Sequence, residues 1–123
     1  MKKQPPPSSV ERVSKMTFAS VYPLLVNKVE KKGRSQEELN EVIEWFTGYD
    51  EKKLNDFIKS EVTFGDFFKK ATINRNAHLI TGMVCGYRVE DVEDPLMKQV
   101  KQLDRLIDEL ARGRKMEKIL RRE

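Results

Sequence analysis

The chain has 123 residues, of which 38% are hydrophobic and 36% charged, and its 24 Lys and Arg against 20 Asp and Glu give a net charge of +4. This length suits one domain with its own core, and so high a charged fraction is typical of short helices with solvated outer faces. A single cysteine, Cys85, excludes a disulfide within the chain, and no apolar run approaches the roughly 18 residues of a membrane span. We therefore expect a cytoplasmic protein that packing alone stabilises.

The first 15 residues combine Met-Lys-Lys with a stretch rich in proline and serine. No apolar region follows the two lysines directly, so the segment does not have the composition of a signal peptide. We expect residues 1–15 to form a disordered tail and residues 16–123 to form a single helical domain with a basic C-terminal segment.

Start and stop signals predict two helices in the next part of the chain. The first is expected from Val21 to Lys32, with Pro23 in its first turn, where a missing amide donor would have had no partner. The second begins at a capping box, in which Ser35 and Glu38 satisfy each other's end-group amides, and it ends at Gly48.

Two shorter helices are expected to follow, with Asp50 and Thr63 as their caps. Four of the six phenylalanines lie between Phe57 and Phe68 at helical spacing, which indicates core positions. Trp45 falls outside the apolar stripe of its own helix, so it is a candidate for a second contact surface.

Residues 72–94 carry a weaker pattern. Apolar residues recur at helical spacing after Asn76, but Gly82 and Gly86 interrupt them. We predict a short helix from Ala77 to Cys85 and then a loop, with a short hairpin as the alternative.

The clearest helix is predicted from Pro95 to Arg112. Asp94 is its cap, and proline fits the first helical position, where no amide donor is needed. Its apolar stripe is heptad-like but lasts little more than two heptads, so packing on the chain's own core is favoured over a coiled-coil dimer. The candidate surface for a protein partner or a second copy consists of Trp45, Leu96, Val100 and Leu103.

Basic residues gather at the C-terminus, while the body of the chain is mildly acidic. They are candidate nucleic-acid contacts, although cations also suit the negative end of the preceding helix. The turn at Gly48 resembles a helix-turn-helix in outline, but the following helix mixes lysines with acids. We expect Met116, Ile119 and Leu120 to dock this segment, and the candidate contacts are Arg112, Arg114, Lys115, Lys118, Arg121 and Arg122.

Few residues are candidates for catalysis or for binding a metal ion or an anion. His78 and Cys85 lie seven apart, which on one helix or one strand does not give the contact of about 3 Å that a thiolate and its base need. The acidic residues that precede the Asp94 cap, Glu90, Asp91 and Glu93, do not follow the residue pattern of a calcium-binding loop. Arg88 is expected to pair with one of these acids or, alternatively, to accept an anion. We expect no catalytic residue, metal or cofactor.

Several segments resemble a bacterial family, the domain of unknown function numbered 2200. They are Phe18-Ala-Ser-Val-Tyr-Pro, Trp45-Phe-Thr-Gly-Tyr, Leu79-Ile-Thr-Gly-Met-Val-Cys-Gly-Tyr-Arg-Val-Glu-Asp and Leu103-Asp-Arg-Leu-Ile-Asp-Glu-Leu-Ala-Arg-Gly-Arg. The chain departs from the family in the linker at residues 71–76, where a more proline-rich segment is expected. The resemblance implies a small cytoplasmic bacterial protein without an assigned activity, and it places in the family's signature the candidate functional loop Cys85, Gly86, Arg88, Glu90 and Asp91.

Together these patterns predict a single all-α domain of five or six short helices with the Pro95 helix at its centre. The leading hypothesis is a non-enzymatic module that binds a protein partner or itself. Nucleic-acid binding through the basic ends is the second hypothesis. A small-molecule or enzymatic site near Cys85 and Arg88 is the third.

Overall fold

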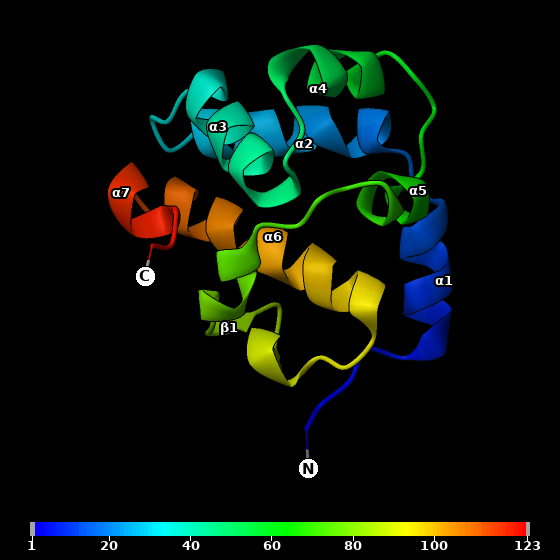
Figure 1. Cartoon of the computed structure of the whole chain (residues 1–123). Helices are drawn as coiled ribbons and strands as arrows, with labels where there is room; N and C mark the ends of the chain where they lie inside the picture. Colours follow the sequence, from blue (N-terminus) through cyan, green and yellow to red (C-terminus); the bar gives the residue numbers. More distant parts are fainter. Residues whose placement is uncertain (1, 123) are drawn as a thin grey trace.

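Helices make up most of the chain in the computed structural model, which describes residues 2–122 (Figure 1). The all-α class is confirmed, with one two-stranded hairpin among the described residues. Along the chain the elements are α1 (Pro7–Lys15), α2 (Phe18–Glu30), α3 (Gln36–Thr47), α4 (Glu51–Ile58), α5 (Phe64–Lys69), the 3₁₀ helix η1 (Arg75–Leu79), β1 (Met83–Val84), β2 (Tyr87–Arg88), the 3₁₀ helix η2 (Val89–Asp91), α6 (Pro95–Ala111) and α7 (Met116–Ile119).

The predicted Pro95 helix, α6, lies at the centre of the fold. The Asp94 side chain accepts a hydrogen bond from the Met97 amide at 2.9 Å, which confirms the cap. Figure 1 shows α6 crossing the middle of the molecule, with α2, α3 and α4 above it and the hairpin and η2 below. Its inner stripe is almost completely buried and consists of Leu103, Leu106, Ile107 and Leu110.

The aromatic core is centred on Phe67. Its ring stacks on that of Phe18 with 4.4 Å between centroids, and it also contacts the rings of Tyr49 and Phe57. Phe64 and Phe68 complete the cluster. Every phenylalanine between positions 57 and 68 is 7% exposed or less, so the prediction that they are core residues is confirmed.

The prediction of a disordered tail is wrong for residues 7–15, which form α1. Pro7 occupies the first helical position, where proline is favoured. Val10 and Val13, three residues apart, are half-buried on one side of the helix, and α1 packs against α5 and α6. The sequence did contain this signal, but two valines among polar residues make a short stripe.

Helix α2 begins at Phe18, three residues earlier than predicted, because Thr17 is its cap. Pro23 therefore lies inside the helix, not in its first turn. A bridge between Thr17 and Thr63 holds the caps of α2 and α5 side by side, and the Phe18 amide donates to the carbonyl of residue 62 at 2.9 Å. Thr17 and Thr63 are far apart in the sequence, so the local sequence pattern around α2 could not predict this pairing.

The capping box of α3 is confirmed. The Glu38 amide donates to Ser35 Oγ at 3.1 Å, and the Ser35 amide donates to Glu38 Oε1 at 3.1 Å. Gly48 ends the helix with a φ of 76°. Arg34 also donates to Glu38, with 2.7 Å between Nη2 and Oε2. The Arg34 hydrogen bond, followed by that of the Ser35 amide, lowers the pKa of Glu38 from 4.5 to about 2.

We expect Glu38→Gln to destabilise the fold by about 1 kcal/mol at pH 7, since the charged side of the box and an ion pair near the surface are both lost. A carboxyl with a lowered folded-state pKa stabilises the protein above its unfolded pKa, and this stabilisation is lost as pH falls through the folded pKa. The difference between wild type and variant should therefore shrink below pH 4.5 and vanish near pH 2. Urea unfolding across this pH range measures it, and a difference that does not change with pH would contradict this assignment.

The helix predicted from Ala77 to Cys85 is wrong, and the hairpin alternative is right for the end of that segment. Residues 75–79 form η1, and β1 pairs with β2 in the register Met83 to Arg88 and Val84 to Tyr87. The turn consists of Cys85 and Gly86, both with positive φ, at 50° and 81°. Two consecutive residues with positive φ suit a tight hairpin turn. Because a right-handed helix requires negative φ, the helix cannot continue through them.

Gly82 has a φ of 112° and lies over the Arg105 side chain of α6. A Cβ added there would be 3.0 Å from Arg105 Cζ. Gly82→Ala should therefore cost about 1–3 kcal/mol through backbone strain, plus the displacement of Arg105. Gly33→Ala is the matched control, because Gly33 has a φ of 81° and open space around it. Equal losses for the two variants in urea unfolding would show that the Arg105 contact contributes nothing.

Candidate functional site

An apolar groove lies between α2 and α6 and is closed at one end by α1 and α5. Its volume is about 220 Å³. The lining side chains are apolar except for Lys101 and Asp104, and the apolar ones are Val13, Met16, Val21, Leu25, Phe64, Phe68, Met97, Val100 and Leu103. We call this hollow, together with the second hollow described next, the α2–α6 groove.

A second, more polar hollow of about 410 Å³ adjoins the first at Asp104. Asp104 lines both hollows, so it marks the junction between them. The remaining lining residues of the second hollow come from α2, the hairpin and the end of α6, and they are Lys28, Met83, Val84, Cys85, Asp108 and Arg112.

Three large apolar side chains are exposed among the described residues, and all belong to this region. Met16, 39% exposed, lines the first hollow, and Met83, 50% exposed, lines the second. Leu24, 63% exposed, is on α2 three residues after Val21 and four before Lys28, which places it on the same side of the helix. Two of the three exposed large apolar side chains therefore line the groove, and the third lies beside it on α2.

Asp104 is half-buried, and among residues 2–122 it has no hydrogen bond or ion pair. Burial raises the pKa of its carboxyl, and the nearby Asp108 carboxylate adds to this effect. Lys101 and Lys28 oppose the shift through their charge. Lys28 is instead paired with Asp108, with 3.5 Å between Nζ and Oδ1. The junction of the groove thus holds a carboxyl without a direct partner.

The predicted partner surface is divided by the fold. Val100 and Leu103 line the α2–α6 groove. Leu96 lines a neighbouring hollow of about 350 Å³, which adjoins the first hollow at Phe68. Trp45 is half-buried on α3 and packs against the core. Trp45 therefore lines neither of the hollows that hold Leu96, Val100 and Leu103, and Asp104, a polar residue of the groove, was missed by sequence reasoning.

The candidate functional loop is held by contacts within the protein. Glu90 accepts a hydrogen bond from the Gly82 amide at 3.2 Å, and the Asp91 carbonyl accepts one from the Gln4 side chain at 2.7 Å. Arg88 is exposed on β2, and the described residues give it no ion pair, so the predicted pairing with an acid is not observed. Cys85 is exposed and lines the second hollow, which Arg88 does not.

Two lysines contact the second strand of this hairpin. Lys3 and Lys101 both lie over the Tyr87 ring, with Nζ 4.9 Å and 5.1 Å from its centroid. Gly86 is close to Lys3, since a Cβ there would be 3.4 Å from its Nζ. The basic residue Lys3 and the segment that carries it therefore have a structural contact.

Three of the six candidate nucleic-acid contacts are engaged in ion pairs. Arg112 pairs with Asp108 at 3.2 Å. Arg114 and Arg121 pair with the buried Glu109, with shortest distances of 3.0 Å and 2.6 Å. Lys115, Lys118 and Arg122 are exposed. Ile119 and Leu120 are buried and Met116 is half-buried, which confirms the predicted docking of this segment.

Basic residues that follow α2 lie next to the basic C-terminal segment. Arg34 donates to the carbonyl of Arg114 at 2.7 Å, so the loop after α2 lies against the chain that leaves α6. Lys31 and Lys32 are exposed beside it. Because α2 and α6 end at the same side, their negative dipole ends also favour cations here.

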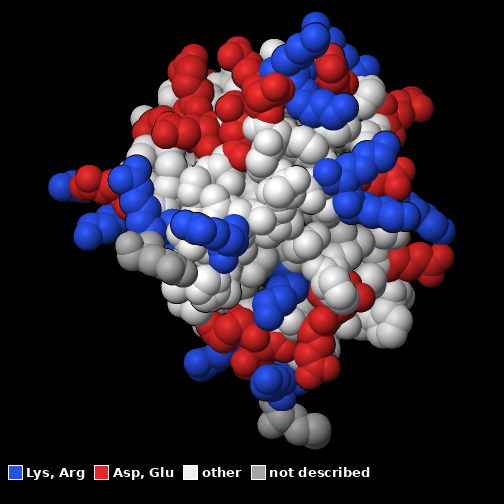
Figure 2. All heavy atoms as spheres, in the orientation of Figure 1, with Lys and Arg blue, Asp and Glu red and all other residues white. Residues whose placement is uncertain are grey.

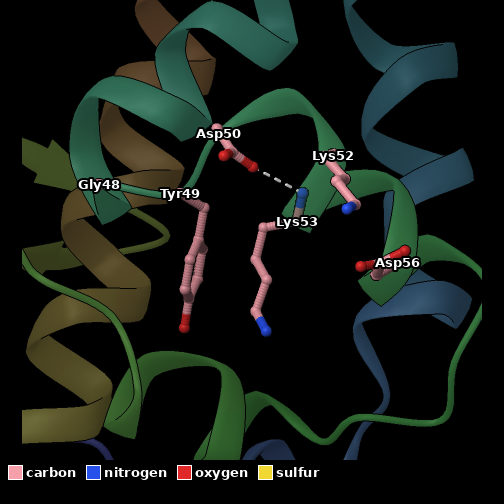
Figure 3. A pocket seen from close by; sticks show the side chains of 6 residues that line it. All are labelled: Gly48, Tyr49, Asp50, Lys52, Lys53 and Asp56. Atoms are coloured by element: carbon pink, nitrogen blue, oxygen red, sulfur yellow. Dashed lines mark hydrogen bonds between the residues drawn. The ribbon is translucent and has the colours of Figure 1, made fainter.

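A polar hollow of about 460 Å³ lies at the turn between α3 and α4 (Figure 3). Figure 3 shows Tyr49 and Lys53 extending along its wall. Tyr49 donates to the carbonyl of Phe67 at 2.5 Å, and burial raises the pKa of its phenol. Asp50 accepts from the Lys53 amide at 2.8 Å as the cap of α4. These side chains have structural roles, so we do not assign the site to this hollow.

Acidic side chains gather over α3, at the upper left of Figure 2. Burial, followed by the charges of Glu51, Asp50 and Glu41, raises the pKa of Glu44. A helix-turn-helix that binds DNA through α3 and α4 would bring this acidic surface towards phosphates. The charge of this part of the molecule therefore disfavours that interpretation.

Within residues 2–122, no group of three or more His, Cys, Asp or Glu side chains is placed to hold a metal ion. No helix of the same residues is long and apolar enough to cross a membrane. His78 lies in η1, with its Nδ1 2.9 Å from the Arg75 carbonyl, and Cys85 lies in the hairpin turn.

Comparison with protein families gives a match over residues 12–121 to the model described as an uncharacterized protein conserved in bacteria, DUF2200. The chain belongs to this family. A solved structure titled "Crystal structure of uncharacterized protein SP1917" is similar to this DUF2200 member, with a TM-score of 0.85 and 39% sequence identity over 89% of this chain and 91% of that one. No curated protein matches the chain.

Proposed function

We propose that this DUF2200 protein is a non-enzymatic interaction module of the cytoplasm that binds an amphipathic helix of a protein partner in the α2–α6 groove. The observation that carries the proposal is the position of the three exposed large apolar side chains of the described residues, because Met16 and Met83 line this groove and Leu24 lies beside it on α2. Exposed apolar side chains that gather along a groove are typical of interaction sites.

The shape and lining of the groove favour a helix as the ligand. Two helices form its walls, and side chains at helical spacing, such as Val21, Leu25 and Lys28 of α2, face it. An amphipathic helix binds such a groove with apolar anchors at positions i, i+3, i+4 and i+7. The first hollow supplies apolar walls for these anchors, and the second supplies the polar end.

A peptide-display selection tests the proposal. The library consists of 16-residue helical peptides with a fixed i, i+3, i+4, i+7 apolar stripe and random residues elsewhere, and the wild-type protein is the target. Leu24→Glu places a charge beside the groove at an exposed position, so we expect binding of the selected peptides to fall at least about tenfold. Asn55→Glu is the control, since it introduces the same charge at an exposed position of α4, which lines neither hollow of the groove.

Circular dichroism confirms that each variant is folded. Selected peptides that bind Leu24→Glu as tightly as the wild type would overturn the proposal, as would a selection that yields no peptide.

The partner helix could belong to a second copy of the chain, which was an expectation from the sequence. Light scattering distinguishes this version, because a monomer has a mass of 14.4 kDa and a dimer twice that mass. A dimer that Leu24→Glu dissociates would assign the groove to self-association.

Nucleic-acid binding is the second candidate, and the observation that favours it is the joining of Lys31, Lys32 and Arg34 to the basic C-terminal segment. Binding of mixed-sequence single- and double-stranded DNA should then weaken steeply with salt and be lost when Lys115, Lys118 and Arg122 are changed to glutamine. Binding that the triple variant retains would remove this candidate.

A further inference from the structure

We infer that the partner helix places a lysine or arginine side chain against Asp104, at the junction of the two hollows. This inference rests on the proposed function and names the side chain that gives it specificity. It requires one cationic residue on the apolar face of the bound helix or at its edge.

The position of Asp104 carries the argument. It is the residue that the apolar and the polar hollow share, so a ligand that occupies both hollows lies beside it. The described charged groups around it are Lys28 of α2, Lys101 and Asp108 of α6, and Arg112 after α6, which pairs with Asp108. Lys28 is within ion-pair distance of Asp108, and Lys101 lies over the Tyr87 ring, so neither makes a direct contact with Asp104.

The chemistry of the groove then selects the partner's side chain. A lysine or arginine has an apolar stem that can lie along the wall near Leu25 and Val100, with its charged end at Asp104. A bound helix also excludes water from the carboxyl, and an unpaired carboxylate without water is costly. A neutral residue leaves that cost in place, and an acidic residue adds repulsion, so the groove discriminates against both.

The raised pKa of Asp104 agrees with this geometry, because burial without a direct partner is its largest cause. Ionisation then opposes folding in the free protein at neutral pH. Asp104→Asn should therefore increase the stability to urea at pH 7, and the increase should decline as the pH falls through the folded-state pKa and disappear below the unfolded-state pKa. A variant that is less stable than the wild type at pH 7 would show that the carboxyl has a structural partner and would overturn the inference.

Binding of matched peptides is the closing experiment. One selected peptide is made in three versions, with Lys, Met or Glu at the position opposite Asp104, and each is titrated against wild type and Asp104→Asn by calorimetry. With the wild type, we expect the Lys version to bind about tenfold more tightly than the Met version and the Glu version to bind most weakly. With Asp104→Asn, the preference for Lys over Met should disappear.

The outcomes separate this inference from the proposed function. Equal affinities of the three versions for the wild type would overturn the inference while the groove remained a binding site. A preference for Lys that persists with Asp104→Asn would also overturn it, because another acid would then be the partner. Failure of the helical library to yield any peptide would overturn both.

Discussion

Glu109→Gln is expected to destabilise the protein by about 3–5 kcal/mol, because it removes one side of a buried ion-pair network. The Glu109 side chain is 4% exposed, and Arg105, Arg114 and Arg121 all donate to its oxygens or pair with them. An amide keeps the shape of the carboxylate, but it has no charge and turns a donor group towards the guanidinium groups. The network joins α6 to the C-terminal segment, so that segment should detach first.

Urea unfolding at neutral pH measures the loss, and amide hydrogen exchange of residues 116–122 measures the detachment. The control is Glu117→Gln, the same change at an exposed position of α7, which should alter stability by less than about 0.5 kcal/mol. A Glu109→Gln protein as stable as this control would mean that Ile119 and Leu120 hold the segment by apolar packing alone.

Phe67→Ala is expected to cost about 3–5 kcal/mol, which is a large part of the stability of a small domain. The Phe67 ring is fully buried and contacts five other aromatic rings, so its removal leaves a cavity where α2, α4 and α5 meet. The surrounding rings pack against one another, so they cannot move far into the space that Phe67 leaves, and the cavity stays open.

Phe67→Leu separates the volume of the side chain from its aromatic character. It keeps most of the volume, so it should cost about 1–1.5 kcal/mol. Chemical denaturation of the two variants gives both values. A loss below about 1 kcal/mol for Phe67→Ala would show that the core can close around the missing ring, and the aromatic cluster would not be the centre of stability.

Sequence patterns predicted the elements whose signals are local. Ser35 with Glu38, and Asp94 with Pro95, define helix starts within four residues, and the structure has both. The hairpin at Cys85 was left as an alternative, because the same apolar residues fit a helix until the positive φ of the turn is known. Helix α1 was missed, since its few apolar residues become a packing face only beside α5 and α6.

The groove was predicted only in part, for a similar reason. Val100 and Leu103 were identified from the stripe of α6, but their partners on α1, α2 and α5 are brought to them by the fold. Asp104 follows Leu103 in the sequence and has the pattern of a solvated position, so burial from α2 could not be read from spacing. The basic C-terminal residues were identified as candidate nucleic-acid contacts, but the buried carboxylate that pairs with two of them was not recognised.

The most direct test of the groove as a binding surface is chemical-shift mapping by NMR. The wild-type protein, labelled with ¹⁵N and with ¹³C at its methyl groups, is titrated with a selected helical peptide. We predict that the perturbed amides and methyl groups lie at Met16, Leu24, Met83, Val100 and Asp104, along both hollows. Perturbations confined to the basic C-terminal segment, or to the surface around Trp45, with the groove unchanged, would contradict the account.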